Sequence, residues 1–314
     1  MPQINNKYRG GALLTALFIM TLVAIVATAM STKIQVDIYR TRLIITHDKL
    51  YYASQAVAFW AMGELNDPKK RFTKPDANGM VSIYPKALAN IYPNVIISGE
   101  LYDLQARYNL NNLSNKKMIL GFVNFIGYTV PQISIPEKMT LALAINDWIS
   151  TYDLAIGKDT FLSYYLNQKP PYYPSHQLMS SGSELRLIKD VSAKIYLALE
   201  PYITALPEPT TLNINTASKQ VLLSLSNSMT EEKVNQLIEA RGKNGIKRQD
   251  KVNELLKKLN ISADQITLES NYFLSVAHTS SDNINFTLFT LLKRSRDKKG
   301  KLSVTILRES FNVF

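Results

Sequence analysis

The sequence lacks several of the residues on which catalytic and metal sites are usually built. It contains no Cys, which excludes disulfides, thiolate metal clusters and cysteine nucleophiles. Its three His residues, His47, His176 and His278, lie far apart along the chain. They offer few candidates for a His-rich metal centre or a His-based catalytic triad. No Gly-rich phosphate loop, H-E-x-x-H helix or G-x-S-x-G elbow occurs. We therefore predict that the protein is not an enzyme.

Length and composition indicate an ordinary folded protein with a basic surface. The chain has 314 residues, 46% of them hydrophobic, and carries 36 basic and 25 acidic side chains for a net charge of +11. At roughly 100–200 residues per domain this predicts about two folded units and excludes disorder of the whole chain.

Charge is absent from residues 10–32, and this stretch is almost wholly apolar. About 20 residues of helix cross the hydrocarbon layer of a bilayer, so the segment is long enough to span it. Lys7 and Arg9 precede it, and Lys33, Arg40 and Arg42 follow it. Because basic residues flank both ends, local charge gives only a weak indication of its orientation in the membrane. We place the short amino-terminal end inside the cell because so few residues cannot fold.

A cleavable signal peptide is the alternative, since Ala27, Thr28 and Ala29 supply a small-x-small site. Against it, no Gly or Pro occurs from Ala12 to Met62, and a continuous helix of that length is a rod of roughly 75 Å. In its second part, apolar residues recur at three-, four- and seven-residue steps, which predicts one face packed on a domain. The residues of this face are Ile34, Ile38, Ile45, Tyr52, Ala56 and Phe59.

The start of the apolar run, Lys7 to Gly10 and then Gly11 to Thr15, resembles the leader of type IV pilins and type II secretion pseudopilins. The resemblance implies cleavage by a prepilin peptidase between Gly10 and Gly11, N-methylation of Gly11 and retention of the helix. Thr15 stands where the family usually has Glu, and the K-type minor pseudopilins typically lack that Glu. Small side chains permit close helix packing in the membrane. The ones assigned here are Ala12, Thr15, Ala16 and Ala24.

An internal run from Asp103 to Leu113 carries a second resemblance. Its Asn residues suit a strand end or tight turn, because Asn tolerates left-handed backbone and bonds its own chain. The run D-x-Q-x-R-[FY]-N-x-N-x-L is similar to the most recognisable signature of the K-type pseudopilins. The matching residues are Asp103, Gln105, Arg107, Asn109, Asn111 and Asn112.

The rest of the chain alternates between strand and helix character. Short β-rich runs cover 95–104, 272–277, 286–291 and 302–307, with a hairpin tip at 297–300. Between them, helices are predicted over 139–152, over 184–199, from Thr230 to Gly242 and around Leu255. The late strands need partners from residues 80–113.

We therefore predict an α+β fold, in which a transmembrane helix continues into a long helix packed on a small antiparallel sheet, as in pilins. An all-α domain, similar to SAM or helix-hairpin-helix domains, interrupts it. The predicted boundaries are a leader at 1–10, a transmembrane part at 11–32, a discontinuous α/β domain at 33–113 and 270–314, and a helical insert at 114–269 with a sub-boundary near 205–211.

Residues 212–259 support an alternative function. They are similar to helix-hairpin-helix domains, which hold DNA phosphates with the backbone N–H groups of a glycine-containing hairpin. The corresponding hairpin, Ser226 to Thr230, has no glycine. A membrane-anchored DNA-binding protein is therefore the alternative, and we expect no nucleic acid partner.

Asp147, Asp153 and Asp159 are candidate calcium ligands near one turn-rich loop, because Ca²⁺ takes several carboxylate and carbonyl oxygens. The family loop is richer in acids, and Ser150 and Tyr152 stand where further acids are expected. A helix-capping or solvated role for these carboxylates is the alternative. No other cofactor is expected.

Together the two resemblances imply a K-type minor pseudopilin of the type II secretion system, at the tip of a periplasmic filament that it helps to nucleate. The implied partners are minor pseudopilins of the I, J and H classes, the inner-membrane assembly platform and the prepilin peptidase. The implied location is the cell inner membrane, crossed once, with the C-terminal domains in the periplasm.

Overall fold

The computed structural model describes residues 11–73, 79–151, 160–248 and 250–312. The chain divides into two units, Met1–Tyr52 and Ala53–Phe314, and each is described by itself. One helix, α1 (Gly11–Asn66), belongs to both.

In the first unit, α1 is an uninterrupted helix whose apolar side chains from Ala12 to Ile45 are exposed. Its Thr hydroxyls donate to carbonyls of the preceding turn, as Thr15 Oγ1 does to Gly11 O at 3.1 Å and Thr32 Oγ1 to Thr28 O at 2.9 Å. These bonds keep polar side chains on the helix without a partner from outside it. By length and composition α1 can cross a membrane, as the sequence predicts.

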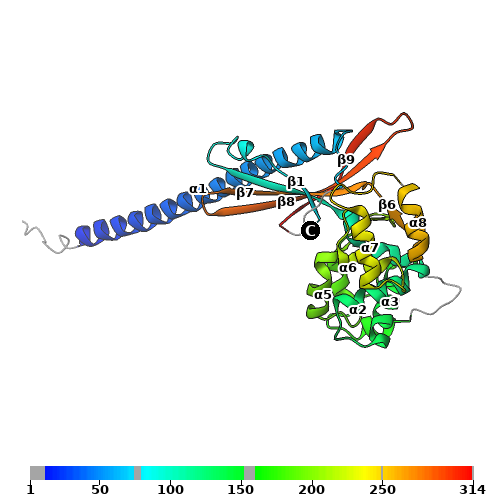
Figure 1. Cartoon of the computed structure of the whole chain (residues 1–314). Helices are drawn as coiled ribbons and strands as arrows, with labels where there is room; N and C mark the ends of the chain where they lie inside the picture. Colours follow the sequence, from blue (N-terminus) through cyan, green and yellow to red (C-terminus); the bar gives the residue numbers. More distant parts are fainter. Residues whose placement is uncertain (1–10, 74–78, 152–159, 249, 313–314) are drawn as a thin grey trace, which may run out of the picture. The chain divides into compact units, whose positions relative to one another are not determined.

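The second unit is built on a five-stranded antiparallel sheet of order β1-β2-β7-β8-β9 (Figure 1). Its strands are β1 (Met80–Ile83), β2 (Ile96–Asp103), β7 (Tyr272–Ser281), β8 (Ile284–Arg296) and β9 (Leu302–Phe311). Strands β2 and β7 are neighbours, with Ser98 opposite His278, although most of the chain separates them in sequence. The predicted pairing of the late strands with residues 80–113 is confirmed.

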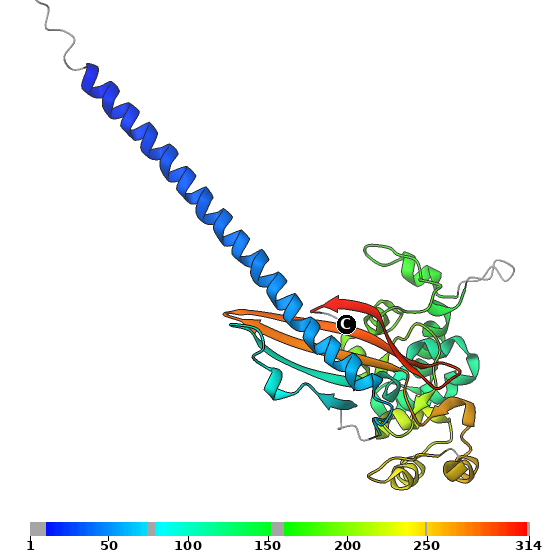
Figure 2. The same cartoon turned by 90° about the horizontal axis from the view of Figure 1, so that it is seen from above.

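The last turns of α1 lie across one face of this sheet (Figure 2). In the second unit the buried side chains on the helix are Val57, Leu65 and small ones such as Ala53 and Ala61. Gly99 of β2 permits the close approach, since a Cβ there would lie 2.4 Å from Val57 Cγ1.

The predicted apolar face of the long helix is wrong. Phe59 is 65% exposed, Ala56 is half-buried, and the other predicted members, Ile34, Ile38, Ile45 and Tyr52, are exposed. Periodicity showed an apolar stripe but not which stripe meets the sheet. In the second unit the buried stripe is the one with small side chains, because these let the helix axis approach the strands.

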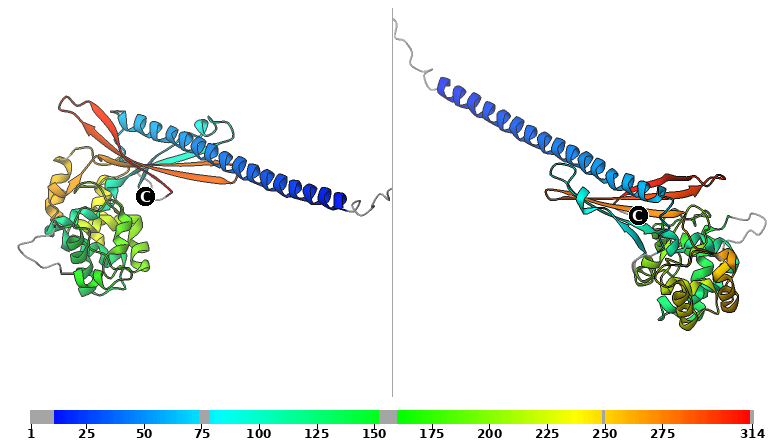
Figure 3. Two further views of the ribbon diagram at one scale, coloured as in Figure 1. Left: turned by 180° about the vertical axis from the view of Figure 1, so that it is seen from behind. Right: turned by 45° about the horizontal axis from the view of Figure 1, so that its top comes forward.

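Residues between β2 and β7 form the helical part of the second unit, on the side of the sheet opposite to the end of α1 (Figure 3). One core joins these helices, with Phe122, Trp148, Leu222 and Leu237 all buried. The helices are α2 (Ile119–Thr129), α3 (Ile135–Ile149), α4 (Leu162–Leu166), α5 (Ala193–Leu199), α6 (Lys219–Leu222), α7 (Glu231–Arg241) and α8 (Asp250–Leu259).

Local capping explains where these helices begin and end. Thr230 caps α7 and Gly242, with φ of +52°, ends it, as predicted. The predicted helix over 139–152 instead begins at Ile135, because Ser134 and Glu137 form a capping box. The predicted helix over 184–199 is wrong as a single element. A 3-10 helix, Gly182–Leu187, precedes α5, which begins at its own cap, Ser192.

Two short parallel strand pairs complete the second unit. Strand β3 (Tyr108–Asn109) pairs with β4 (Ile203–Thr204), and β5 (Leu212–Asn213) pairs with β6 (Ile266–Thr267). Strand β3 follows β2 closely in sequence and β6 precedes β7 closely, whereas β4 and β5 lie within the helical part. The domain boundaries given above stay a prediction.

Candidate functional site: the signature clamps and the adjoining cleft

The predicted signature begins with a buried carboxylate at the end of β2. Asp103 Oδ2 accepts hydrogen bonds from Asn213 Nδ2 (3.0 Å), Thr216 Oγ1 (2.6 Å) and Ser270 Oγ (2.7 Å), and its Oδ1 accepts one from Gln105 N (2.8 Å). Burial raises the pKa of Asp103, and the hydrogen bonds oppose that rise. One carboxylate thus ties the sheet to segments more than a hundred residues away.

Gln105 forms the second link of the signature. Its Nε2 donates to Thr211 O at 2.9 Å, and its Oε1 accepts from Asn271 N at 2.5 Å. The side chain therefore bridges the backbone that enters β5 and the backbone that enters β7. Such bonds satisfy backbone groups that the short strands leave unpaired.

Asn109 and Asn111 act as a pair. Asn109 Oδ1 accepts from Asn111 N (3.2 Å) and from Leu206 N (3.1 Å). Asn111 Nδ2 donates to Met179 O (2.9 Å) and Leu206 O (2.7 Å), and its Oδ1 accepts from Met179 N (2.8 Å). Asn111 is fully buried and bonds the backbone of two other segments, so the pair is a clamp as well as a turn.

Asn112 adds a two-way bond to one residue. Its Nδ2 donates to Thr210 O at 2.8 Å and its Oδ1 accepts from Thr210 N at 2.8 Å. The interpretation of the Asn cluster as a local turn was therefore incomplete, because the three side chains mainly bond distant backbone. The partners of the signature, Asn213, Thr216 and Ser270, were missed. A usable signal was present in the sequence, since L-N-I-N-T at 212–216 repeats the spacing of Y-N-L-N-N at 108–112.

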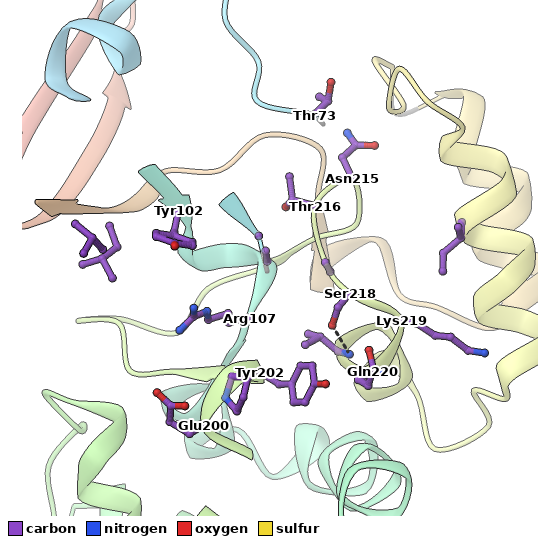
Figure 4. Close-up of a pocket in the computed structure, with 18 of the residues that line it drawn as sticks. Thr73, Tyr102, Arg107, Glu200, Tyr202, Asn215, Thr216, Ser218, Lys219 and Gln220 are labelled. Atoms are coloured by element: carbon purple, nitrogen blue, oxygen red, sulfur yellow. Dashed lines mark hydrogen bonds between the residues drawn. The ribbon is translucent and has the colours of Figure 1, made fainter. Parts of the chain in front are cut away.

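Arg107 differs from the other signature residues. Its guanidinium makes no hydrogen bond and no ion pair with any residue that the structure describes, and burial lowers its pKa. Glu200 and Tyr102 are the groups that act on its charge. Figure 4 shows these side chains around a cleft of about 1300 Å³ in the second unit.

The remaining predicted site residues lie on α1 or near the loop after α3. Gly11 is the first residue of α1, and Ala12, Thr15, Ala16 and Ala24 are exposed along it. Gly10 lies outside the described residues.

Asp147 lies half-buried in α3, whereas Asp153 and Asp159 lie outside the described residues. Within the described part of the chain, no three His, Asp or Glu side chains gather as metal ligands do. Calcium at this loop stays a prediction.

The hairpin that suggested DNA binding is used internally in this fold. Asn124 Nδ2 donates to Leu223 O (2.9 Å), Ser226 O (3.2 Å) and Met229 O (3.1 Å). Gly121 of the same helix allows this contact, because a Cβ there would lie 2.2 Å from Ser224 O. The hairpin is thus packed on α2 through its carbonyl groups.

Comparison with known proteins gives the family. Two family models described as type II secretion system (T2SS), protein K, match residues 106–208 and 212–273. Type II secretion system protein K of Aeromonas hydrophila is 31% identical over 240 residues, which are 69% of each chain. The chain belongs to the type II secretion system protein K family. The Pseudomonas aeruginosa protein of that name is 27% identical over 208 residues, 64% of this chain and 61% of its own length.

A solved relative shows the same fold. One chain in the crystal structure of the GspK-GspI-GspJ complex from the enterotoxigenic Escherichia coli type 2 secretion system matches with a TM-score of 0.69 and 20% identity. The match covers 87% of this chain and 99% of that chain. Family membership favours the pseudopilin interpretation over the DNA-binding alternative. The signature agrees with this interpretation, because its side chains make hydrogen bonds within the fold.

Proposed function

We propose that the protein is a minor pseudopilin that caps the tip of the periplasmic pseudopilus and helps to nucleate it, in the machinery that exports folded proteins across the outer membrane. The observation that carries the proposal is α1 itself, in a chain of the protein K family. One helix begins in an exposed apolar stretch and ends in the core beneath the sheet, at Leu65. Anchor and folded domain are therefore one element, as a filament subunit requires.

This function places the apolar part of α1 in the inner membrane, crossing once, with the second unit in the periplasm. Prepilin peptidase would cut between Gly10 and Gly11, and Gly11 would receive the N-methyl group. The small side chains of Ala12, Thr15, Ala16 and Ala24 then allow close packing against other membrane helices. The role is assembly and needs no catalytic group of this chain.

The proposed partners are other minor pseudopilins, of the I, J and H classes, and the inner-membrane assembly platform. The related chain in the Escherichia coli complex is found with GspI and GspJ, which supports partners of the I and J classes. Thr15, in the place of the usual Glu, suits a subunit with none above it in the filament.

The first experiment determines the mature amino terminus. The full chain is expressed with and without a prepilin peptidase and analysed by mass spectrometry. A mature chain that begins with N-methylated Gly11 only when the peptidase is present supports the proposal. A chain left uncut with the peptidase, or cut after Ala29, contradicts it.

A second experiment tests assembly. The chain is produced in a strain that lacks its own K-type subunit, and secreted protein is measured together with co-purification of the other minor pseudopilins. The Gly10→Val variant, which should not be processed, is the matched control. Restored secretion by the unaltered chain alone is the expected result, and salt-sensitive binding to duplex DNA without pseudopilin partners would favour the alternative.

A further inference from the structure

The cleft of about 1300 Å³ has an apolar floor made by the large sheet. Leu274 and Val276 of β7, Tyr102 of β2 and Phe289 of β8 line it, on the face of the sheet opposite to that covered by α1. Tyr102 and Phe289 are only partly buried. Aromatic and aliphatic side chains therefore form the floor of the cleft.

The walls of the cleft are cationic. The basic side chains that line it are Arg107, Arg186, Lys219, Arg241 and Lys243. Glu200 is the one acidic side chain among the described residues of the lining. Because surface charges close together repel one another, this concentration of one sign favours an anionic occupant.

Some of these basic side chains are bonded to other residues of the described chain. Lys219 pairs with Glu231 at 2.6 Å, and Arg241 Nη1 donates to Ala217 O at 2.7 Å. Arg186 lies over the ring of Tyr196, 5.7 Å from its centroid, and forms no ion pair within the described chain. Arg107, as shown above, also lacks a bonded partner among the described residues.

Arg107 lies at the junction of the floor and the walls. It follows the two signature residues that tie β2 to distant backbone, Asp103 and Gln105, and it precedes Asn109. Its backbone is therefore held on both sides, which limits the positions its guanidinium can reach. A planar guanidinium held in place suits bidentate recognition of a carboxylate.

We propose that this cleft binds an extended acidic segment of another polypeptide, with carboxylates on the Arg and Lys walls and an aromatic or aliphatic side chain on the sheet floor. A peptide is the occupant of choice because small-molecule sites measure about 300–1000 Å³, and this cleft is larger. Its apolar floor has no counterpart in the backbone contacts that dominate nucleic-acid binding.

The test is a binding titration on the full chain in a zwitterionic detergent. The probe is a short fluorescein-labelled peptide of alternating Glu and Phe, followed by fluorescence anisotropy. Peptides of alternating Lys and Phe, and of alternating Glu and Ser, separate the contributions of charge and of the floor. We expect the Glu/Phe peptide to bind tightest, and equal binding of the Lys/Phe peptide would overturn the proposal.

Variants locate the binding. Arg186→Glu changes an exposed residue of the wall, and we expect it to raise the Kd of the Glu/Phe peptide about tenfold. Lys299→Glu makes the same charge change at the exposed hairpin tip and should leave the Kd unchanged. Equal weakening by both variants would show binding to net charge alone and would overturn the proposal.

Arg107→Met removes the deeper charge while keeping the apolar stem. We expect a loss of affinity at least as large as for Arg186→Glu, with an unchanged circular dichroism spectrum. If Arg107→Met does not fold, Arg186→Glu with Lys299→Glu still decides the question. Full competition by a duplex oligonucleotide at moderate salt would assign the cleft to nucleic acid and overturn the peptide proposal.

Discussion

Two segments of the second unit share a pattern but hold different partners. In Y-N-L-N-N at 108–112 and in L-N-I-N-T at 212–216, the first Asn accepts a hydrogen bond from the N–H of the second, at 3.2 Å and 3.0 Å. Each segment also begins with a short strand paired in parallel to a later one. The second Asn then bonds two distant segments. Asn111 bonds Met179 and Leu206, and Asn215 bonds Ile246 and Leu268.

The first Asn of each segment differs in what it holds. Asn109 Nδ2 donates to a backbone carbonyl, Glu208 O, at 2.8 Å. Asn213 Nδ2 donates to the buried carboxylate of Asp103. The comparison teaches that N-x-N specifies the local turn, whereas the partner depends on which segment the fold brings near. The first clamp, Asn109 and Asn111, joins parts of the helical core. The second clamp, Asn213 and Asn215, joins that core to the large sheet.

The largest expected effect comes from removing the second Asn of either clamp. Asn111→Ala leaves two carbonyls and one N–H without their bonds in a buried place and should lower the free energy of unfolding by about 3 kcal/mol. Asn215→Ala should cost a similar amount, since it loses the same three kinds of bond. Denaturant unfolding of both variants checks this.

Asn227→Ala, at an exposed position, is the control for this pair and should change the free energy of unfolding little. A cost for Asn111→Ala close to that of Asn227→Ala would break the comparison, because one clamp would then be dispensable.

The buried carboxylate makes the second clamp sensitive to pH. Burial raises the pKa of Asp103 in the folded state, so the folded state holds its proton at pH values where the unfolded state has released it. Stability from this group is therefore fully present below the unfolded pKa, about 3.9, and falls as pH rises toward the folded pKa. We expect the free energy of unfolding of the unaltered chain, minus that of Asp103→Asn, to decrease over this range.

Denaturant unfolding at a series of pH values measures this difference. A difference that increases with pH would show that the four hydrogen bonds outweigh burial and that the pKa of Asp103 lies below its ordinary value.

A smaller loss of stability is expected from removing one Thr hydroxyl at either clamp, and the loss should differ between the two clamps. Thr216→Val removes a hydrogen bond of 2.6 Å to the carboxylate of Asp103 and should cost about 2 kcal/mol. Thr210→Val removes a neutral bond of 3.2 Å from Asn109 Nδ2 and should cost about 1 kcal/mol. Thermal unfolding of the two variants ranks them, and the reverse order would mean that the charged centre adds nothing to the second clamp.

The smallest effect is expected from making the first clamp resemble the second. Asn112→Thr places at the end of the first segment the residue that ends the second one, Thr216. It loses the two-way bond with the half-buried Thr210 and should cost about 1 kcal/mol in free energy of unfolding. Asn112→Ala is the reference for this variant. A larger loss for Asn112→Thr than for Asn112→Ala would indicate a clash of the added methyl group.

Much of the fold follows from local sequence rules. The helix from Gly11 to Asn66, the cap of α7 at Thr230, the late strands and their hairpin tip were all predictable, since propensity, capping and alternation act over a few residues. The break between the 3-10 helix Gly182–Leu187 and α5 was missed, because Ser192 competes as a second helix start.

The candidate site was only partly predictable. The signature marked Asp103 to Asn112, but neither their distant partners nor the cleft could be foreseen from spacing. The cleft requires Tyr102, Arg186 and Arg241, which come from three regions of the chain. Only contact between those regions brings their side chains to one place.

The sequence by itself determined most of the elements and the family of this protein, because helix caps, apolar runs and the signature are local patterns. Tertiary structure alone decided which stripe of α1 is buried, which backbone each Asn holds, and where the Arg side chains of the cleft gather. Apolar residues such as Phe59 and Leu65 have the same local preference for burial. Which of them is covered depends on how closely the helix can approach the sheet, and small side chains facing the strands set that distance.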